Sequence, residues 1–532
     1  MTSSPAPNVS GIVLGASALA AAVIGGSMLT RRAGALGKIA LPSPAVARAF
    51  RGGIAHSLAL GKLQVFEDGL LVVGSTGTIE QLVDLGGLKG HEKKELLDKV
   101  RDHYRADVTV LGPSELLIPG LVDAHAHAPQ YAYLGTGMDL PLLQWLETYT
   151  FPCEAKFKDT DLAKRVYTAA VRRSLAGGTT ACSWFATLHL EGSKTLADVV
   201  AALGQRAHVG KVSMDRNSPD FYVEKSTAQG LADVAAFVEY VDTAHGRNPT
   251  VASDDALATG GGVAPPPPLI TPSIIPRFVP SCTSEMMRGL GKLSASMGRR
   301  RQPASGGGGA GGKQPRCLPV HSHLSESLAE IAWVTKELHP EAETYAHVYK
   351  EHGLLHSESY MAHCVHCCDK EVALLRETEA GVVHCPSSNF MLKSGVCDVR
   401  RLLLKGVKVG LGTDIAGGSS VSMIDCMRQA VVASRASSFG SQVAGYEPLT
   451  FAEVFHLATK GSAQVLGMHE ECGDLLPGKR FDALVLDCAA EPMDLFDGSM
   501  APLTARERLE KFFFVGDDRN VKKVFVDGRQ VK

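Results

Sequence analysis

The sequence predicts an α/β protein built on a TIM-like (β/α)8 barrel, with a small β-sandwich domain formed from both ends of the chain. Three observations lead to this prediction. Strand-like runs alternate with amphipathic stretches through the middle of the chain, polar residues cluster where those strands would end, and short β-rich segments flank the middle. Strands that alternate with helices are typical of parallel sheets, and barrel enzymes hold their reactive groups at the carboxyl ends of the strands.

Composition limits the classes of partner. The chain has 532 residues, 45% of them hydrophobic, which is enough to bury a large core. The formal net charge is −2, so no overall field attracts nucleic acid or an anionic membrane, and a small neutral ligand is the better fit. The 12 cysteines are scattered rather than dense, which favours reduced thiols and a cytoplasmic location.

The first 45 residues form a predicted N-terminal extension. An apolar stretch at 12–29 is rich in Ala, Gly and Ser, no basic residue precedes it, and Arg31 and Arg32 follow it. It is barely long enough to span a bilayer, so we expect a disordered or loosely helical extension. An organelle-targeting or membrane-tethering segment is the alternative. No later stretch is typical of a transmembrane helix, so we expect no firm membrane association.

Two β-rich segments lie on either side of the middle. Residues 46–118 contain short apolar runs at 63–66 and 70–73, and residues 469–532 contain similar runs at 482–486 and 521–526. Gly and charged residues separate these runs, as is typical of strands joined by turns. We expect both segments to meet in the small β-sandwich domain.

The middle, residues 119–468, carries the strands of the predicted barrel. Amphipathic stretches separate them; the clearest begins after Asp161 as its N-cap, places Leu162, Val166 and Ala170 on one stripe, and ends at Gly177. Gly- and Pro-rich insertions near 250–270 and 299–316 indicate flexible loops. The eight predicted strands are 117–123, 179–186, 207–214, 273–279, 318–323, 360–365, 381–384 and 407–412.

His125 and His127 give the most specific local signal. They are two residues apart at the end of an apolar run, so on a strand both side chains point to the same face. Two imidazoles on one face can bind one metal ion at about 2.0 Å. A lone pair of this kind is weak evidence, because surface histidines produce it often.

Three further strand ends carry groups that suit a metal-dependent hydrolase. His323 is followed by Glu326, a carboxylate able to move protons, although Ser325 as the N-cap of the next helix is a second interpretation. His363 is a ligand or a hydrogen-bond donor to the attacking oxygen. Asp414 could bind the metal, although an Asp after a Gly turn is often only a turn former. The conjunction of four such strand ends favours a metal centre.

The cysteines form no convincing second metal site. Cys364, Cys367 and Cys368 lie next to His366, but their spacing lacks the paired arrangement of structural zinc sites. We therefore expect free thiols there. We likewise expect the other cysteines that close or follow predicted strands to be packing residues, namely Cys182, Cys282 and Cys385.

Longer strings of sequence resemble the guanine deaminases of the amidohydrolase superfamily, from about residue 50 to the end of the chain. Gln130, Trp145 and the Arg277-Phe278 pair match that branch specifically, whereas the predicted metal ligands match the wider superfamily. The matching strings occupy residues 120–154, 178–189, 271–278, 322–326, 384–389 and 410–418.

The resemblance implies a hydrolase that converts guanine and water to xanthine and ammonia at one Zn²⁺ per chain. It implies Glu326 as the proton shuttle, His363 as hydrogen-bond donor to the reacting oxygen, and a homodimer. The implied zinc ligands are His125, His127, His323 and Asp414, of which His127 and His323 also border the substrate and Asp414 also takes part in catalysis.

The resemblance also implies how guanine is recognised. Phe278 would stack on the purine, Arg277 would bind its carbonyl oxygen, Gln130 would bind ring nitrogens and Trp145 would line the pocket. The chain departs from the family pattern at two site positions: His321 stands where a small residue or Gln is usual, and Cys364 stands where Gly is usual. We expect His321 to face away from the metal.

Two other functions are also alternatives for this sequence. A related deaminase or chlorohydrolase acting on an s-triazine, cytosine or a nucleoside would share the zinc site and differ at Gln130, Arg277 and Phe278. A catalytically inactive scaffold protein is less consistent with the chain, because every predicted metal ligand is present. Iron or manganese could use the same ligands in place of zinc.

Overall fold

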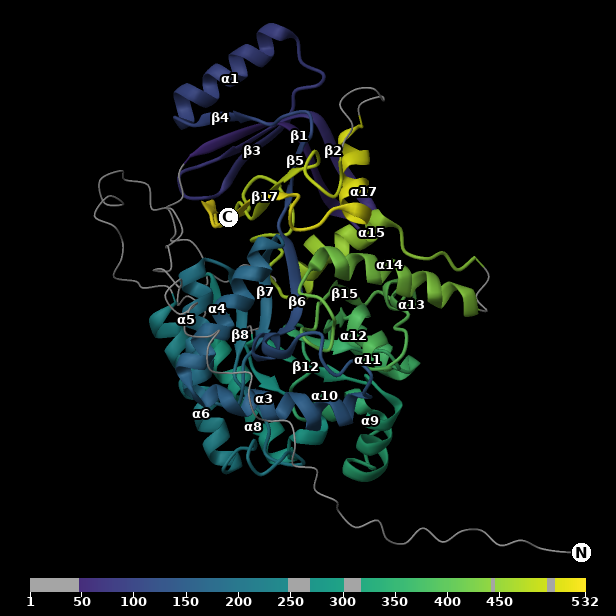
Figure 1. Cartoon of the computed structure of the whole chain (residues 1–532). Coiled ribbons are helices and arrows are strands. Elements are labelled where there is room, and N and C mark those ends of the chain that lie inside the picture. The colour runs from purple at the N-terminus through teal and green to yellow at the C-terminus, as the bar shows by residue number, and fades with distance from the viewer. Residues whose placement is uncertain (1–46, 247–267, 301–316, 442–444, 495–502) are drawn as a thin grey trace, which may run out of the picture. The chain divides into compact units, whose positions relative to one another are not determined.

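The computed structural model describes residues 47–246, 268–300, 317–441, 445–494 and 503–532 (Figure 1). The predicted extension at 1–45 lies outside the described residues. The predicted insertions near 250–270 and 299–316 also lie outside them, apart from their first or last few residues.

Strands from both ends of the chain join in one eight-stranded sheet. Its order is β18-β17-β16-β5-β1-β2-β3, and β4 pairs with β1. The predicted runs 63–66 and 70–73 belong to a single strand, β2. The strands are β1 (Arg48–Ala59), β2 (Lys62–Val73), β3 (Ile79–Asp84), β4 (Asp107–Val110), β5 (Glu115–Pro119), β16 (Ala483–Asp487), β17 (Val521–Val526) and β18 (Arg529–Gln530).

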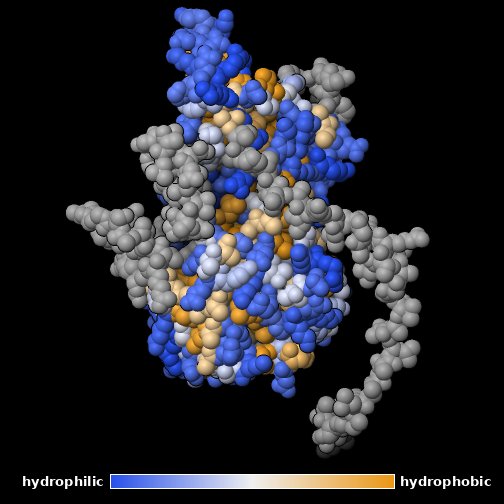
Figure 2. Space-filling view, turned by 90° about the vertical axis from the view of Figure 1, so that its left-hand side faces the viewer, coloured by the Kyte–Doolittle hydropathy of each residue, from blue (hydrophilic) through white to orange (hydrophobic). Residues whose placement is uncertain are grey.

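Aromatic packing holds this sheet together across the chain ends. The ring centroid of Phe50 lies 5.3 Å from that of Phe481 and 5.5 Å from that of Phe525, so a residue near the N-terminus packs on two near the C-terminus. Helix α1 (Gly90–Tyr104) presents a hydrophilic surface at the top of Figure 2. The strands form one sheet, so the two facing sheets of the predicted sandwich remain a prediction.

The middle of the chain contains parallel strands close to all eight predicted positions. The predicted first strand, 117–123, is divided at Gly120, where the chain passes from the small sheet into β6. A Cβ at Gly120 would lie 1.9 Å from Thr180 Oγ1, so only glycine fits there. The strands are β6 (Leu121–His127), β7 (Thr179–Phe185), β8 (Arg206–Gly210) with β9 (Val212–Ser213), β10 (Ile270–Pro272) with β11 (Ile275–Pro276), β12 (Val320–Leu324), β13 (Ser359–His363), β14 (Gly381–His384) and β15 (Lys408–Leu411).

These strands form three parallel sheets, ordered β10-β8-β7-β6, β11-β9 and β12-β13-β14-β15. Backbone hydrogen bonds connect their edges: Ile274 N donates to Pro319 O at 2.8 Å, and Asp414 N donates to His125 O at 2.8 Å. No single sheet of the described strands passes through all eight positions. The arrangement is α/β with parallel strands that alternate with helices, as predicted.

Helices follow most of the strands. Helix α4 is capped by Asp159, whose carboxylate accepts from the N–H groups of Asp161 and Leu162, so the predicted cap at Asp161 is wrong by two residues. Of the predicted stripe of α4, Ala170 is buried, whereas Leu162 and Val166 are only partly buried. The longer helices are α4 (Thr160–Ala176), α5 (Leu190–Leu203), α6 (Thr227–Ala244), α8 (Ser284–Arg300), α11 (Asp369–Glu377), α14 (Met423–Gly440) and α17 (Ala505–Val515).

Shorter helical turns follow several strands and complete the fold. They are η2 (Ala128–Tyr133), α2 (Leu142–Trp145), η3 (Leu146–Thr150), α3 (Phe151–Glu154), η4 (Ala155–Lys158), η5 (Val279–Ser281), α9 (Leu328–Trp333), η6 (Val334–Leu338), α10 (Tyr345–Glu351), α12 (Pro386–Met391), α13 (Val399–Leu404), α15 (Phe451–His456), η7 (Leu457–Gly461) and α16 (Ser462–Val465). Across the described part of the chain, no helix is both long and apolar enough to cross a bilayer.

Candidate active site

A pocket of about 400 Å³, counted out to the surrounding solvent, lies at the carboxyl ends of the parallel strands. All the predicted site residues line it except His125, which is fully buried next to His127. The lining residues are His127, Gln130, Leu142, Trp145, Leu146, Arg277, Phe278, His323, Glu326, His363, Leu392 and Asp414.

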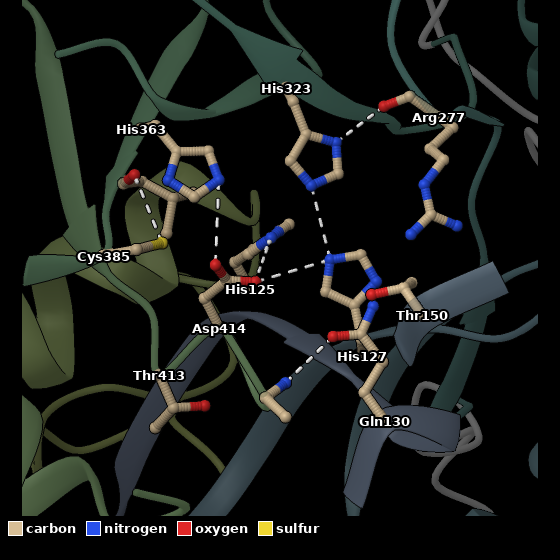
Figure 3. Close-up of polar contacts among 12 residues, drawn as sticks. His125, His127, Gln130, Thr150, Arg277, His323, His363, Cys385, Thr413 and Asp414 are labelled. Atoms are coloured by element: carbon tan, nitrogen blue, oxygen red, sulfur yellow. Dashed lines mark hydrogen bonds and ion pairs between the residues drawn. The ribbon is translucent and has the colours of Figure 1, made fainter. Parts of the chain in front are cut away.

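Four predicted metal ligands converge at this pocket (Figure 3). His127 Nε2 lies 3.3 Å from His323 Nε2, and Asp414 Oδ1 lies 3.1 Å from His125 Nε2 and 3.4 Å from His127 Nε2. Two groups of three residues have ligand atoms within 4.8 Å of one another: His125 with His127 and His323, and His125 with His363 and Asp414. Two imidazole nitrogens that face each other beside a carboxylate are a donor set that fits one cation.

The protonation of these groups suits metal binding. Burial, together with neighbouring cationic groups, holds the pKa values of His127 and His323 well below the ordinary value, so both rings are neutral. Burial alone would raise the pKa of Asp414, but His125 and His363 beside it hold that pKa well below its usual range. Metals require neutral imidazoles and ionised carboxylates, so the cluster is already in its binding form.

Hydrogen bonds orient the imidazole rings of the predicted metal ligands. His323 Nδ1 lies 2.6 Å from the carbonyl oxygen of Arg277 and donates to it, which leaves the lone pair of Nε2 facing the cluster. His125 Nδ1 lies 2.7 Å from His321 Nε2. His321 belongs to neither group of potential metal ligands, but its Nε2 points toward the cluster, at Nδ1 of His125.

Asp123 was missed by sequence reasoning. Its carboxylate accepts from Thr413 N at 3.0 Å, from the Thr413 hydroxyl and from His125 N at 3.2 Å, so it joins β6 to the turn that holds Asp414. Burial raises the pKa of Asp123 to about 7. Its position two residues before His125 on the same strand face was the available signal.

Three residues at the strand ends adopt positive φ angles, which are costly for side chains other than glycine. They are Ser325 (φ 47°), His363 (φ 71°) and Asp414 (φ 48°). Such strain of about 1–3 kcal/mol per residue accumulates at functional sites, where the surrounding structure enforces it. Cys364, which directly follows His363, also has a positive φ (47°), and six further described non-Gly residues outside this group have positive φ as well.

Glu326 and His363 lie opposite the histidine pair. His363 Nε2 is 3.4 Å from Glu326 Oε2 and 3.8 Å from Asp414 Oδ2, while its Nδ1 donates to Asn389 Oδ1 at 3.0 Å. Burial raises the pKa of Glu326. Burial would lower the pKa of His363, but the adjacent carboxylates of Glu326 and Asp414 raise it overall.

The second interpretation of Ser325, as the N-cap of the next helix, is wrong. Helix α9 begins at Leu328 and is capped by Ser327, whose hydroxyl accepts from the N–H of Glu330. Ser325 instead donates to Glu371 at 3.1 Å. Glu326 is therefore outside the helix, 3% exposed, and its side chain lines the pocket.

Arg277 and Gln130 also line the pocket, and both donate to a buried carboxylate that sequence reasoning missed. Glu154 is fully buried and accepts from Arg277 Nη1 at 2.7 Å, from Arg277 Nη2 at 3.2 Å and from Gln130 Nε2 at 2.9 Å. Tyr222 donates to it at 2.8 Å. Gln130 Oε1 also accepts from Ala416 N at 3.0 Å, so its amide is held from both sides.

Apolar and aromatic side chains complete the wall. Phe278 is 7% exposed and Trp145 is 2% exposed, and both line the pocket with Leu142 and Leu146. Trp145 Nε1 donates to Thr136 O at 3.2 Å, which fixes the indole. A flat pocket wall beside fixed polar groups suits a planar heterocycle.

Among the described residues, no cysteine belongs to either group of potential metal ligands. Cys364 and Cys367 are buried, Cys368 is exposed, and all three have free thiols. His366 Nε2 donates to Ser394 O at 2.6 Å. The three strand cysteines predicted to be packing residues are fully buried with free thiols: Cys182, Cys282 and Cys385.

Comparison with known proteins gives a consistent result. A model described as the amidohydrolase family matches residues 116–300 and 314–531. A guanine deaminase of Dictyostelium discoideum is 39% identical over 491 residues, covering 92% of this chain and 98% of that protein. The human guanine deaminase is 36% identical over 491 residues, covering 92% and 97%.

Solved structures agree. A guanine deaminase from C. acetobutylicum with guanine bound in its active site has a TM-score of 0.74 and 34% identity, covering 91% of this chain and 100% of that one. The E. coli guanine deaminase has a TM-score of 0.74 and 28% identity, covering 91% and 99%. The fold is therefore TIM-barrel-like, and the chain belongs to the amidohydrolase family and, within it, to the guanine deaminases.

Proposed function

We propose that this protein hydrolyses guanine to xanthine and ammonia with the help of one zinc ion per chain. The observation that carries the proposal is that His127 lies 3.3 Å from His323 and 3.4 Å from Asp414 in the lining of a pocket that Arg277 also lines. Metal ligands and groups for a planar, polar ligand therefore border the same space. The similar guanine deaminase with bound guanine supports the same substrate.

Zinc would be held by His125, His127, His323 and Asp414. When bound, zinc lowers the pKa of water toward about 7 and so supplies a nucleophile at neutral pH. Three neutral nitrogens and one carboxylate suit zinc, and the hydrogen bond from His323 Nδ1 keeps its Nε2 available for the ion.

Glu326 and His363 would handle the protons. In the net reaction water adds at C2 of guanine, and the exocyclic amine leaves as ammonia after gaining a proton. Burial raises the pKa of Glu326, which suits a group that accepts a proton and then returns it. His363 lies on the same side of the pocket, where its Nε2 hydrogen would bond to the reacting oxygen.

Arg277 and Gln130 would recognise the purine. Glu154 holds both side chains, so their remaining N–H groups have fixed directions before the ligand enters. We assign the guanine carbonyl oxygen to Arg277 and ring nitrogens to Gln130, with Phe278 stacked on the ring and Trp145 in the wall. A ligand without the matching atoms would leave these buried donors unpaired and would bind poorly.

The finer features of the architecture are also part of the proposal. We propose that the eight parallel strands close into a complete barrel over residues 119–468, because backbone hydrogen bonds connect the edges of the separate sheets. We propose that residues 46–118 and 469–532 form the satellite β-sandwich domain. A homodimer in the cytoplasm is the expected assembly and location.

A substrate panel tests the function. Guanine, guanosine, cytosine, adenine and an s-triazine are incubated separately with the purified protein, and ultraviolet absorbance follows each one. We expect turnover of guanine alone, with release of xanthine, in a protein that contains about one zinc per chain. Turnover of the triazine without guanine would assign the chain to a different substrate.

A further inference from the structure

We propose that a buried row of hydrogen-bonded side chains, His321, Ser183, Tyr360 and His208, holds His125 in the tautomer that binds the metal. The inference rests on the metal site of the proposed function. It assigns positioning roles to four residues that do not touch the substrate.

The row begins at His125 and passes through the interior beneath the pocket. His125 Nδ1 is 2.7 Å from His321 Nε2, and His321 Nδ1 is 3.0 Å from Ser183 Oγ. Ser183 Oγ is 2.9 Å from the Tyr360 hydroxyl, which is 3.0 Å from His208 Nδ1. The members come from β6, β12, β7, β13 and β8, so one row connects five strands.

The direction of every hydrogen bond follows from the first. A histidine that binds a metal through Nε2 must carry its proton on Nδ1, so His125 donates and His321 Nε2 accepts. Neutral His321 then carries its proton on Nδ1 and donates to Ser183. The Ser183 hydroxyl donates onward to Tyr360, and Tyr360 donates to His208 Nδ1. One set of orientations satisfies all four contacts.

Packing fixes the row in place. His321, Ser183 and Tyr360 are fully buried, and His208 is 3% exposed. The ring of His321 packs 4.3 Å from that of Tyr360 and 4.5 Å from that of Phe185, centroid to centroid. A rotated or reversed ring would leave a buried N–H without an acceptor, which costs about 1–3 kcal/mol.

Zinc affinity of the purified protein, measured by competition with a chelator, tests the inference. H321L removes the acceptor for His125, and we expect zinc to bind about 10- to 100-fold more weakly. H321Q restores an acceptor oxygen and should keep most of the affinity. Guanine turnover by H321L should recover at saturating zinc, because the residue acts only through His125.

Y360F interrupts the row farther away and keeps the aromatic ring. We expect a loss of zinc affinity smaller than that of H321L, and this variant also provides the test if H321L does not fold. H456L is the matched control, because it removes another buried imidazole, one whose Nδ1 bonds to Ser57 Oγ at 2.9 Å away from the pocket. Its zinc affinity should equal that of the wild type.

Two results would overturn the inference. If H321L and Y360F both bind zinc as tightly as the wild type and H456L, the row does not position His125. If the wild type itself binds no zinc, the metal site of the proposed function is absent, and this inference is removed with it.

Discussion

Two buried polar clusters in this protein differ in whether their own side chains satisfy each other. Arg206 is 1% exposed and is paired: its Nε and Nη2 donate to Asp482 at 2.8 and 3.2 Å, and its Nη1 donates to Glu471 at 2.7 Å. The predicted metal centre is also largely buried, but His127 and His323 face each other nitrogen to nitrogen at 3.3 Å.

The difference separates a structural cluster from a ligand site. Arg206 on β8 meets Asp482 and Glu471 near the start of β16, so the ion pairs connect the barrel strands to the C-terminal strands and need no further partner. The histidine cluster presents several lone pairs to one point, and a cation completes it. Both clusters are buried, so burial does not distinguish them. They differ because the charge of Arg206 is matched by carboxylates of the protein, whereas the histidine nitrogens have no such partner in one another.

The largest effect should come from Glu326→Gln. The amide cannot accept and return a proton, so we expect guanine turnover to fall about 10²- to 10⁴-fold while zinc stays bound. Glu337→Gln, on an exposed residue of the next helical segment, is the control. Steady-state rates with zinc analysis check the pair, and retained turnover in E326Q would remove Glu326 from its role.

Arg206→Met should affect stability rather than chemistry. It leaves the Asp482 carboxylate buried without its partner, which costs about 3–5 kcal/mol. Urea unfolding measures the loss. Arg173→Met breaks an exposed ion pair with Asp518 and should change stability by less than about 1 kcal/mol. Equal stabilities of the two variants would contradict the structural role of the Arg206 cluster.

Glu154→Gln should weaken guanine recognition without removing zinc. The neutral amide cannot hold Arg277 through two charge-assisted bonds, and we expect kcat/KM for guanine to fall about 10- to 100-fold, as for the loss of 1.5–3 kcal/mol. Exposed Glu147→Gln is the control. Unchanged kinetics in E154Q would mean that Arg277 does not depend on this carboxylate.

The smallest effect should come from the acid titration of Asp474. Burial would raise its pKa, but hydrogen bonds from Lys479 and Lys460 lower the pKa overall. Its contribution to stability is therefore present above the unfolded value of about 3.9 and is lost as pH falls through the folded value. The stability difference between wild type and Asp474→Asn should shrink below that pH in urea titrations, and a constant difference would contradict it.

The strands and the site residues could be predicted from the sequence better than the buried residues that hold the site residues in place. His125 and His127 are at the end of β6 and Asp414 follows β15, so local periodicity placed them at the carboxyl ends of parallel strands. Glu154 could not be assigned, because its partners Arg277 and Tyr222 are distant in sequence and meet it only in the folded chain.

The N-caps of two helices were predicted at the wrong residue because the sequence alone does not show the backbone geometry. The cap of α4 lies at Asp159 rather than Asp161, since both residues are suitable caps and only the backbone geometry distinguishes them. The Ser325 cap failed similarly, because Ser327 with Glu330 forms the capping box. His321 was expected to face away from the metal, but its Nε2 points at His125, a contact that depends on how β6 and β12 are placed in the fold and that no local pattern encodes.

X-ray absorption at the zinc edge of the purified protein tests whether the histidine and aspartate cluster is the metal centre. We expect a first shell of three histidine nitrogens and a carboxylate oxygen at about 2.0–2.2 Å, and we expect this shell to be lost when His323 is replaced by Ala. A shell dominated by sulfur, or one unchanged in H323A, would contradict the assignment of this cluster as the metal centre.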